Sequence, residues 1–202
     1  MSWMDILKKR KWQGTLSKEK SKMLERTPKT KVDIPKLSYP QEETEIPAIL
    51  KIMGKKTLNP KQMKDVDLKP EKEMFRIVDA DREDYEDLIK DINYYAMSLK
   101  MKYQRPRPHQ ITKKIKSTKT TTDDTPAFPS GHSMAAYGLE IALGKKYPNK
   151  KKELKQMADR ISLSRIQMGS HYPSDIEAGK KLGYIIGDAY EWMVWNIEKE
   201  KE

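Results

Sequence analysis

Apolar residues recur at three- and four-residue intervals through the C-terminal two thirds of the chain, which is the spacing of amphipathic helices. The clearest run is residues 81–102, whose apolar positions share one face: Tyr85, Leu88, Ile89, Ile92, Ala96 and Leu99. Acidic residues at 81, 83 and 84 suit the start of a helix, and the prolines at 106 and 108 stop it. We therefore predict a helix here that carries Lys100 in its last turns.

Three more helices are predicted beyond the long loop 103–129. Residues 133–147 are rich in small side chains, which let helices approach closely, so we expect this helix to be central. The next helix, 150–168, ends at Gly169 in a C-terminal capping role. The last one is capped by Ser174 or Asp175 and runs to about residue 196. The positions predicted to point inward on these two helices are Leu154, Met157, Ala158, Ile161 and Met168, and then Ala178, Leu182, Ile185, Ala189, Trp192 and Met193.

The N-terminal third has a weaker pattern. Short helices are expected near residue 2, over 46–53 with Pro47 in the first turn, and over 71–77. Asn59-Pro60 indicates either a helix stop or a new start, and the lysine-rich stretch 13–39 is expected to be extended or disordered. No segment alternates as a β-strand would, so the predicted fold class is all-α, a helical bundle with a partly extended arm.

Positive charge is concentrated in that arm. The chain has a formal net charge of +11, and residues 1–64 hold sixteen Lys and Arg against seven Asp and Glu. We predict a basic N-terminal extension over 1–64 and one helical domain over 65–202. The arm suits nucleic acid, an anionic membrane surface or an acidic protein partner, and a merely solvated tail is equally compatible with its composition.

Length and composition bound the class of protein. A chain of 202 residues suits one good domain. No apolar run approaches the roughly 18 residues that a membrane helix needs, and the charged start lacks the pattern of a secretion signal. There is no cysteine, which excludes disulfides and thiolate metal sites. We expect an intracellular, cytoplasmic protein.

Three short segments carry the candidate chemistry. Lys100, Arg107 and Arg165 are cations that can bind the oxygens of a tetrahedral anion, with arginine offering a two-pronged donor. Ser130 adds a hydroxyl, and the backbone N–H of Gly131 can approach an anion closely at an expected helix N-terminus. This set binds a phosphate-like group without needing a metal ion, and we predict no metal site and no cofactor.

Two histidines complete the set. His171 precedes Asp175 by four residues, so the carboxylate can accept a hydrogen bond from one ring nitrogen and leave the other to attack phosphorus. His132 would then protonate the leaving oxygen. Each residue has an ordinary structural alternative, such as a helix cap or a hydrogen-bonded core histidine. Those alternatives explain poorly why all of these residues occur together in three short segments.

The three segments together resemble the signature of the type 2 phosphatidic acid phosphatase superfamily, which includes class A acid phosphatases and vanadium haloperoxidases. Eleven positions match in order and spacing: Lys100-x6-Arg107-Pro108, Pro129-Ser130-Gly131-His132 and Ser164-Arg165-x5-His171-x3-Asp175. A frame ending at Arg105-Pro106 would put Ser98 where lysine is required, so Arg107 is the matching arginine. The resemblance covers 100–175 directly and about 70–198 by helical pattern.

The resemblance implies a helical bundle with the site between helices. It also implies phosphate binding by Lys100, Arg107, Ser130, Gly131 and Arg165, with His132 as acid and His171 as nucleophile positioned by Asp175. We expect a soluble, metal-independent hydrolase of phosphomonoesters or diphosphates, acting on a phosphorylated small molecule through phosphohistidine. One alternative is a vanadium-dependent haloperoxidase, since vanadate, otherwise an inhibitor, fits the same anion site. Another is a non-catalytic binding or structural protein with a basic arm.

Overall fold

The computed structural model describes residues 15–53, 55, 58–116 and 124–199, without the side chains of Trp192 and of residues 194–199. Within these ranges the regular secondary structure is helical and contains no strand, which confirms the all-α prediction. The helix predicted near residue 2 and the inward position of Trp192 both lie outside the description. In the part of the chain that is described, no helix is both long and apolar enough to cross a lipid bilayer.

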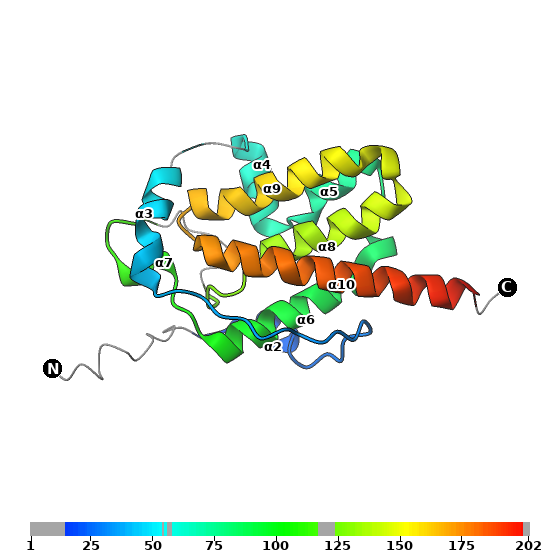
Figure 1. The fold of residues 1–202 in the computed structure, drawn as a ribbon, viewed down its shortest axis with the longest axis horizontal. Helices are drawn as coiled ribbons and strands as arrows, with labels where there is room; N and C mark the ends of the chain where they lie inside the picture. Colours follow the sequence, from blue (N-terminus) through cyan, green and yellow to red (C-terminus); the bar gives the residue numbers. More distant parts are fainter. Residues whose placement is uncertain (1–14, 54, 56–57, 117–123, 200–202) are drawn as a thin grey trace.

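Helix α8 (Gly131–Lys146) is the centre of the bundle. It contacts α10 (Pro173–Lys199), α9 (Lys151–Gln167), α6 (Glu86–Tyr103) and the shorter α5 (Glu71–Val78) (Figure 1). Twelve of its sixteen residues are buried, so it has no continuous polar face. The expectation that the small-residue helix is central is therefore confirmed.

A row of glycines on α10 allows its close contact with α8. Gly179, Gly183 and Gly187 recur every four residues and so lie on one face of the helix. A Cβ atom added at Gly183 would lie 2.7 Å from the carbonyl oxygen of Met134, and one at Gly187 would lie 2.7 Å from that of Gly138. The two backbones thus touch, and no larger residue fits at these positions without a shift of α8 or α10.

Smaller helices surround this core: α2 (Lys18–Lys22), α3 (Glu42–Ile52), α4 (Pro60–Leu68), α7 (Pro108–Ile111) and the one-turn 3₁₀ helices Glu83–Tyr85 and Pro148–Lys150. Asn59 starts α4 with a capping box, because its side chain accepts from the backbone N–H of Gln62 and the Gln62 side chain accepts from that of Asn59. The Asn59-Pro60 pair therefore begins a helix. Helix α7 interrupts the expected loop 103–129.

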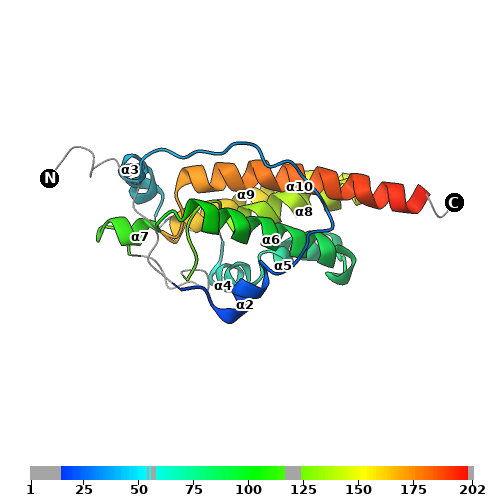
Figure 2. The ribbon, with the colours of Figure 1, turned by 90° about the horizontal axis from the view of Figure 1, so that it is seen from below.

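The described part of the N-terminal extension lies on the bundle. Residues 31–39 form no helix and cross the bundle to reach α3 (Figure 2). The N–H of Thr30 donates to Oδ2 of buried Asp91 at 2.7 Å, and the Tyr103 hydroxyl donates to the carbonyl of Leu37 at 2.9 Å. The predicted domain boundary after residue 64 falls inside α4, so one continuous helix spans both sides of it. The partners predicted for the arm stay predictions.

Several predicted helix starts were wrong, by as much as five residues. Helix α6 begins at Glu86, because residues 83–85 form a separate 3₁₀ turn. Helix α3 begins at Glu42, which places Pro47 beyond the first turn. Helix α10 begins at Pro173, so Ser174 and Asp175 lie within its first turn and do not occupy the cap position.

The buried face of α10 also differs from the prediction. Ile186 and Tyr190 are buried, whereas Ile185 and Ala189 are only half-buried. Ile186 and Tyr190 follow Leu182 at four-residue intervals beside the glycine row, and the contact of that row with α8 fixes the rotation of the helix.

Candidate active site

The predicted site residues come together where α6, α7, α8, α9 and α10 meet at one end of the bundle. They come from the last turn of α6, the N-cap of α7, the start of α8, the last turn of α9 and the start of α10: Lys100, Arg107, Ser130, Gly131, His132, Arg165, His171 and Asp175. Apart from half-buried Gly131, all of them are buried, including three charged residues with no exposed surface: Arg107, Arg165 and Asp175. Such burial is stable only when charges are paired or hydrogen-bonded.

Backbone contacts fix the start of α8 against the start of α10. The N–H of Ser130 donates to the carbonyl oxygen of Asp175 at 3.0 Å. The Ser130 hydroxyl caps α8 by accepting from the N–H of Ser133 at 3.3 Å. The segment that carries His132 is thereby held next to the segment that carries Asp175.

The end of α9 couples Arg165 to His171 through a C-terminal Schellman motif. Gly169 has φ +69°, a left-handed conformation that favours glycine. The N–H of Gly169 donates to Ile166 O at 2.9 Å, and the N–H of Ser170 donates to Arg165 O at 3.1 Å. The predicted capping role of Gly169 is confirmed, and this turn sets the direction in which His171 leaves the helix.

The His171 ring is held at both nitrogens. Nδ1 lies 3.0 Å from Oδ2 of Asp175, and Nε2 lies 3.0 Å from Nη1 of Arg107. The carboxylate can only accept and the guanidinium can only donate, so the neutral ring carries its proton on Nδ1. Asp175 Oδ2 also accepts from the N–H of Tyr172 at 3.0 Å, which fixes the carboxylate in the first turn of α10.

Arg107 and Lys100 are anchored by the loop that precedes α8. Arg107 donates from Nε to the carbonyl of Thr125 at 2.9 Å and from Nη2 to its hydroxyl at 2.9 Å. Lys100 Nζ donates to the carbonyl oxygen of Pro126 at 2.6 Å. These contacts point two cations toward the side of His171 opposite Asp175.

Arg165 and His132 meet at a residue that the sequence did not suggest. Nη2 of Arg165 donates to Oδ1 of Asp67 at 2.8 Å, and Nε2 of His132 lies 3.4 Å from the Asp67 carbonyl oxygen. Asp67 belongs to the last turn of α4, a helix that the sequence left open, because Asn59-Pro60 indicated either a stop or a new start. No local pattern around residue 67 indicates a site residue, because the contact depends on how α4 packs.

Burial and the cluster of cations shift the acid–base properties of the site. Burial, with Arg165 and His171 as further causes, holds the pKa of His132 well below its ordinary value. Burial, followed by Arg107 and Lys100, lowers the pKa of His171 in the same direction. The pKa of Lys100 is also lowered, first by burial and then by Arg107. Both imidazoles are therefore neutral near pH 7 in this environment.

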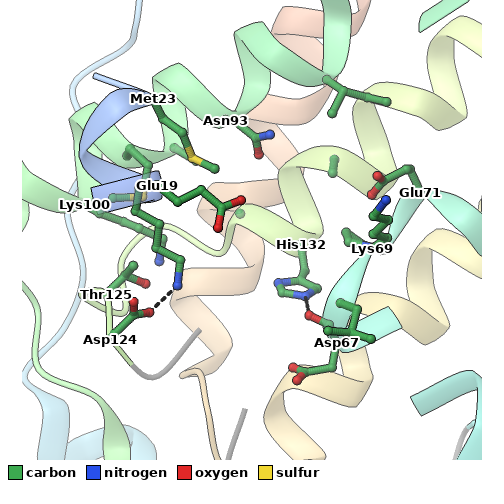
Figure 3. Close-up of a pocket in the computed structure, with 18 of the residues that line it drawn as sticks. Glu19, Met23, Asp67, Lys69, Glu71, Asn93, Lys100, Asp124, Thr125 and His132 are labelled. Carbon is green, nitrogen blue, oxygen red and sulfur yellow. Dashed lines mark hydrogen bonds and ion pairs between the residues drawn. The ribbon is translucent and has the colours of Figure 1, made fainter. Parts of the chain in front are cut away.

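A cavity of about 510 Å³ opens onto these residues. Lys100, Arg107, His132 and His171 line one part of it, and Ile89, Met97 and Met23 are among the apolar side chains of the rest. In Figure 3, His132 points into this space, with Asp67 beside it and Asp124 across from it, where Asp124 pairs with Lys20. The cavity thus combines an anion-binding end with an apolar wall.

The donor set does not resemble a metal centre. Among the described residues, no group of three or more His, Cys, Asp or Glu side chains lies close enough to hold a metal ion. The convergent groups are mostly donors, with Arg107, Arg165 and Lys100 gathered around two imidazoles. Donors of this kind suit the oxygens of a tetrahedral anion.

Arg105 is the second residue that sequence reasoning missed. Its Nη1 donates to Oδ1 of Asp175 at 2.6 Å, and its Nη2 donates to Oε2 of Glu45 at 2.7 Å. Spacing alone excluded it as the phosphate-binding arginine, and its contacts are with the carboxylates of Asp175 and Glu45. The repeated Arg-Pro in Arg105-Pro106-Arg107-Pro108 was the one available signal.

Comparison with known proteins gives a family match. A family model described as PAP2 superfamily matches residues 92–199, which is more than half of the 202-residue chain. The matched segment contains all eight predicted site residues.

Two curated proteins named non-specific acid phosphatase are similar to this chain. The one from Salmonella typhi is 30% identical over 105 residues, covering 50% of this chain and 42% of that protein. The one from Salmonella typhimurium is 32% identical over 98 residues, covering 46% of this chain and 38% of that protein. The chain therefore spans about two fifths of the length of these relatives.

Among solved structures, the crystal structure of a transmembrane PAP2 type phosphatidylglycerolphosphate phosphatase from Bacillus subtilis has a TM-score of 0.46 at 18% sequence identity. The alignment covers 80% of this chain and 86% of that one.

Proposed function

The chain belongs to the PAP2 superfamily, and we propose that it is a phosphatase that hydrolyses phosphomonoesters or diphosphates through a phosphohistidine intermediate. The observation that carries the proposal is that both ring nitrogens of His171 have a polar partner: Nδ1 contacts Asp175 and Nε2 contacts Arg107. This arrangement fixes one tautomer and directs the Nε2 lone pair at the cation cluster, where the phosphoryl group would bind.

In the first step, the lone pair of His171 Nε2 attacks phosphorus and the bond to the leaving oxygen breaks. One phosphoryl oxygen would replace His171 Nε2 as the acceptor of the hydrogen bond from Arg107 Nη1. The other phosphoryl oxygens would accept hydrogen bonds from Lys100 and Arg165. Catalysis of phosphoryl transfer is mostly positioning and charge stabilisation, which three buried cations supply.

His132 is assigned to the proton transfers. Its imidazolium gives a proton to the leaving oxygen, and the neutral ring then takes a proton from the water that attacks the phosphohistidine. Burial and Arg165 lower its pKa, which disfavours the imidazolium before substrate binds. A phosphate dianion beside it acts in the opposite direction, so substrate binding itself would promote protonation of His132.

The reaction class draws support from the two relatives named non-specific acid phosphatase. Because the chain spans about two fifths of their length, both the activity and the substrate class are part of the proposal. The cavity has room beyond the phosphate end and an apolar wall, which favours a small organic phosphate over a bulky polyanion. Metal independence is likewise proposed, from the donor character of the site.

The test is hydrolysis of a chromogenic aryl phosphate by the purified protein in EDTA, beside the variant His171→Ala. We expect activity that survives EDTA, is inhibited by vanadate and is lost in the variant. Rapid acid-free quenching with radiolabelled substrate should trap phosphate on the wild-type chain and none on His171→Ala. A wild-type protein without activity on aryl phosphates and small diphosphates, or activity unchanged in His171→Ala, would refute the proposal.

A further inference from the structure

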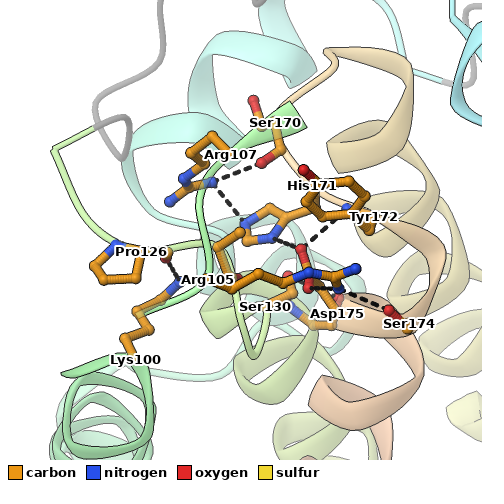
Figure 4. A network of polar contacts seen from close by, with 12 residues as sticks. Lys100, Arg105, Arg107, Pro126, Ser130, Ser170, His171, Tyr172, Ser174 and Asp175 are labelled. Atoms are coloured by element: carbon orange, nitrogen blue, oxygen red, sulfur yellow. Dashed lines mark hydrogen bonds and ion pairs between the residues drawn. The ribbon is translucent and has the colours of Figure 1, made fainter. Parts of the chain in front are cut away.

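Arg105 is a fully buried cation next to the proposed active site, and it touches none of the groups assigned to the phosphate. It leaves the loop after α6 and turns behind Asp175, so that the guanidinium lies on the side of the carboxylate away from Arg107 (Figure 4). A buried charge of this kind is costly unless its partners compensate it.

The partners of Arg105 form a site shaped for a planar guanidinium. The ring centroids of Tyr39 and Tyr172 lie 4.1 and 3.8 Å from its central carbon. Arginine stacks on aromatic rings in this way, whereas the compact ammonium of lysine cannot fill such a slot. The residue type is therefore specified by shape as well as by charge.

The hydrogen bonds of Arg105 run in two directions. Nη1 donates to Oδ1 of Asp175 at 2.6 Å and to Oγ of Ser174 at 2.7 Å. Nη2 donates to Oε2 of Glu45 at 2.7 Å. Glu45 also accepts from the N–H of Ser174 at 2.8 Å, so α3, Arg105 and the first turn of α10 form one connected network.

Asp175 is consequently held on both oxygens. Oδ1 bonds to Arg105, while Oδ2 bonds to Nδ1 of His171 and to the N–H of Tyr172. With both oxygens fixed, the carboxylate cannot rotate away from the imidazole. The direction in which His171 presents Nε2 therefore depends on a residue that does not touch the reacting atoms.

We propose that Arg105 is a positioning residue for the nucleophile: it fixes the Asp175 carboxylate, and through it the Nδ1–H tautomer and the orientation of His171. The inference rests on the phosphohistidine function proposed above. It also gives the N-terminal extension a part in the reaction, because Tyr39 and Glu45 complete the slot that holds the guanidinium.

The first test is kinetic, with Arg105→Ala. Outer partners of metal-ligating histidines typically contribute about 10- to 100-fold, and we expect kcat to fall by a similar amount here. KM should change little, because the phosphate-binding cations are untouched. Guanidinium ion, added below the concentration that unfolds the wild type, should enter the slot between the two tyrosines and restore part of kcat. Arg105→Lys should remain impaired despite its charge.

A matched control removes another guanidinium that ties the N-terminal extension to a buried carboxylate. Arg26 donates to Oδ1 of Asp91 at 2.6 Å, in a contact that does not involve Asp175 or His171. Arg26→Ala should keep wild-type kcat and show no recovery with guanidinium. If Arg105→Ala keeps wild-type kcat, or if its loss is not reversed by guanidinium while the protein is folded, the inference is wrong.

A second readout does not depend on activity. Proton and nitrogen-15 NMR of the ring of His171 should report an Nδ1–H proton in a strong hydrogen bond to Asp175 in the wild type and a weakened hydrogen bond in Arg105→Lys, because the carboxylate has lost its anchor on Oδ1. The lysine variant retains a cation and therefore serves as the test if Arg105→Ala fails to fold. An unchanged Nδ1–H signal in the folded lysine variant would overturn the inference. A wild-type protein without phosphatase activity would refute the proposed function alone, since the NMR measurement still tests Arg105.

Discussion

Oδ1 of Asp67 lies 2.8 Å from Nη2 of Arg165, and the carbonyl oxygen of the same residue lies 3.4 Å from Nε2 of His132. One residue from the end of α4 therefore contacts two groups that the proposed mechanism assigns to phosphate binding and proton transfer. Asp67 also lines the cavity. It adds a negative charge at the place where an anionic substrate would bind.

Replacement of Asp67 by asparagine should strengthen anion binding. Asp67→Asn keeps an oxygen that can accept from Arg165 and removes the repulsion between carboxylate and phosphate. We expect KM for an aryl phosphate and the inhibition constant of inorganic phosphate to fall roughly threefold to tenfold, equivalent to about 0.7–1.4 kcal/mol. Asp65→Asn is the control, because Asp65 lies on the same helix and pairs with half-exposed Arg76. Weaker phosphate binding in Asp67→Asn would mean that the carboxylate mainly orients Arg165.

The role of His132 predicts a dependence on the leaving group. A general acid typically contributes about 10²- to 10⁴-fold when the leaving oxygen needs a proton. His132→Ala should therefore lose far more activity on an alkyl phosphate than on a nitrophenyl phosphate, whose leaving group departs as an anion. The measurement is kcat/KM for both substrates, with His109→Ala as the histidine control. Equal losses on the two substrates would contradict the assignment of His132 as acid.

Stability should decrease as the solution is acidified. Burial is the main cause that lowers the pKa of both His132 and His171, with Arg165 and Arg107 as the next causes. Below about pH 6.5, the ordinary histidine pKa, the unfolded chain binds more protons than the folded one. The free energy of unfolding therefore decreases as the pH is lowered, until the folded-state pKa values are reached. Thermal melts between about pH 7 and about pH 5 in phosphate-free buffer measure this.

The variant His132→Asn/His171→Asn isolates the histidine contribution to that pH dependence. Its melting temperature should decline less steeply on acidification than that of the wild type, because two groups that resist protonation are gone. Identical slopes for the two proteins would show that the imidazoles do not oppose protonation in the folded state.

The glycine row on α10 predicts an effect on stability. A Cβ at position 183 would meet the Met134 carbonyl at 2.7 Å, so Gly183→Ala forces α10 away from α8. We expect a loss of about 1–3 kcal/mol in the free energy of unfolding, as in other overpacked cores. Chemical denaturation measures it, with Lys181→Ala as a control at an exposed position of the same helix. A stability equal to wild type would show that the contact relaxes without cost.

Local pattern predicted most of the helices well. The inward face of α6 was assigned from the spacing of residues such as Leu88, Ile92 and Leu99, and all are buried. The face of α10 was assigned less well, because glycine carries no hydrophobic signal. Packing of Gly179, Gly183 and Gly187 on α8 determined which side of that helix is inside.

The sequence by itself determined the helical class, the central place of the small-residue helix and the eight candidate residues of the site. Those features are encoded locally, in a period of three to four residues and in short motifs of fixed spacing. Only the tertiary structure decided which acids hold which arginines: Glu45 meets Arg105 across 60 positions, and Asp67 meets Arg165 across 98. Such pairings arise from the packing of whole helices against one another, and buried charges must find partners wherever that packing places them.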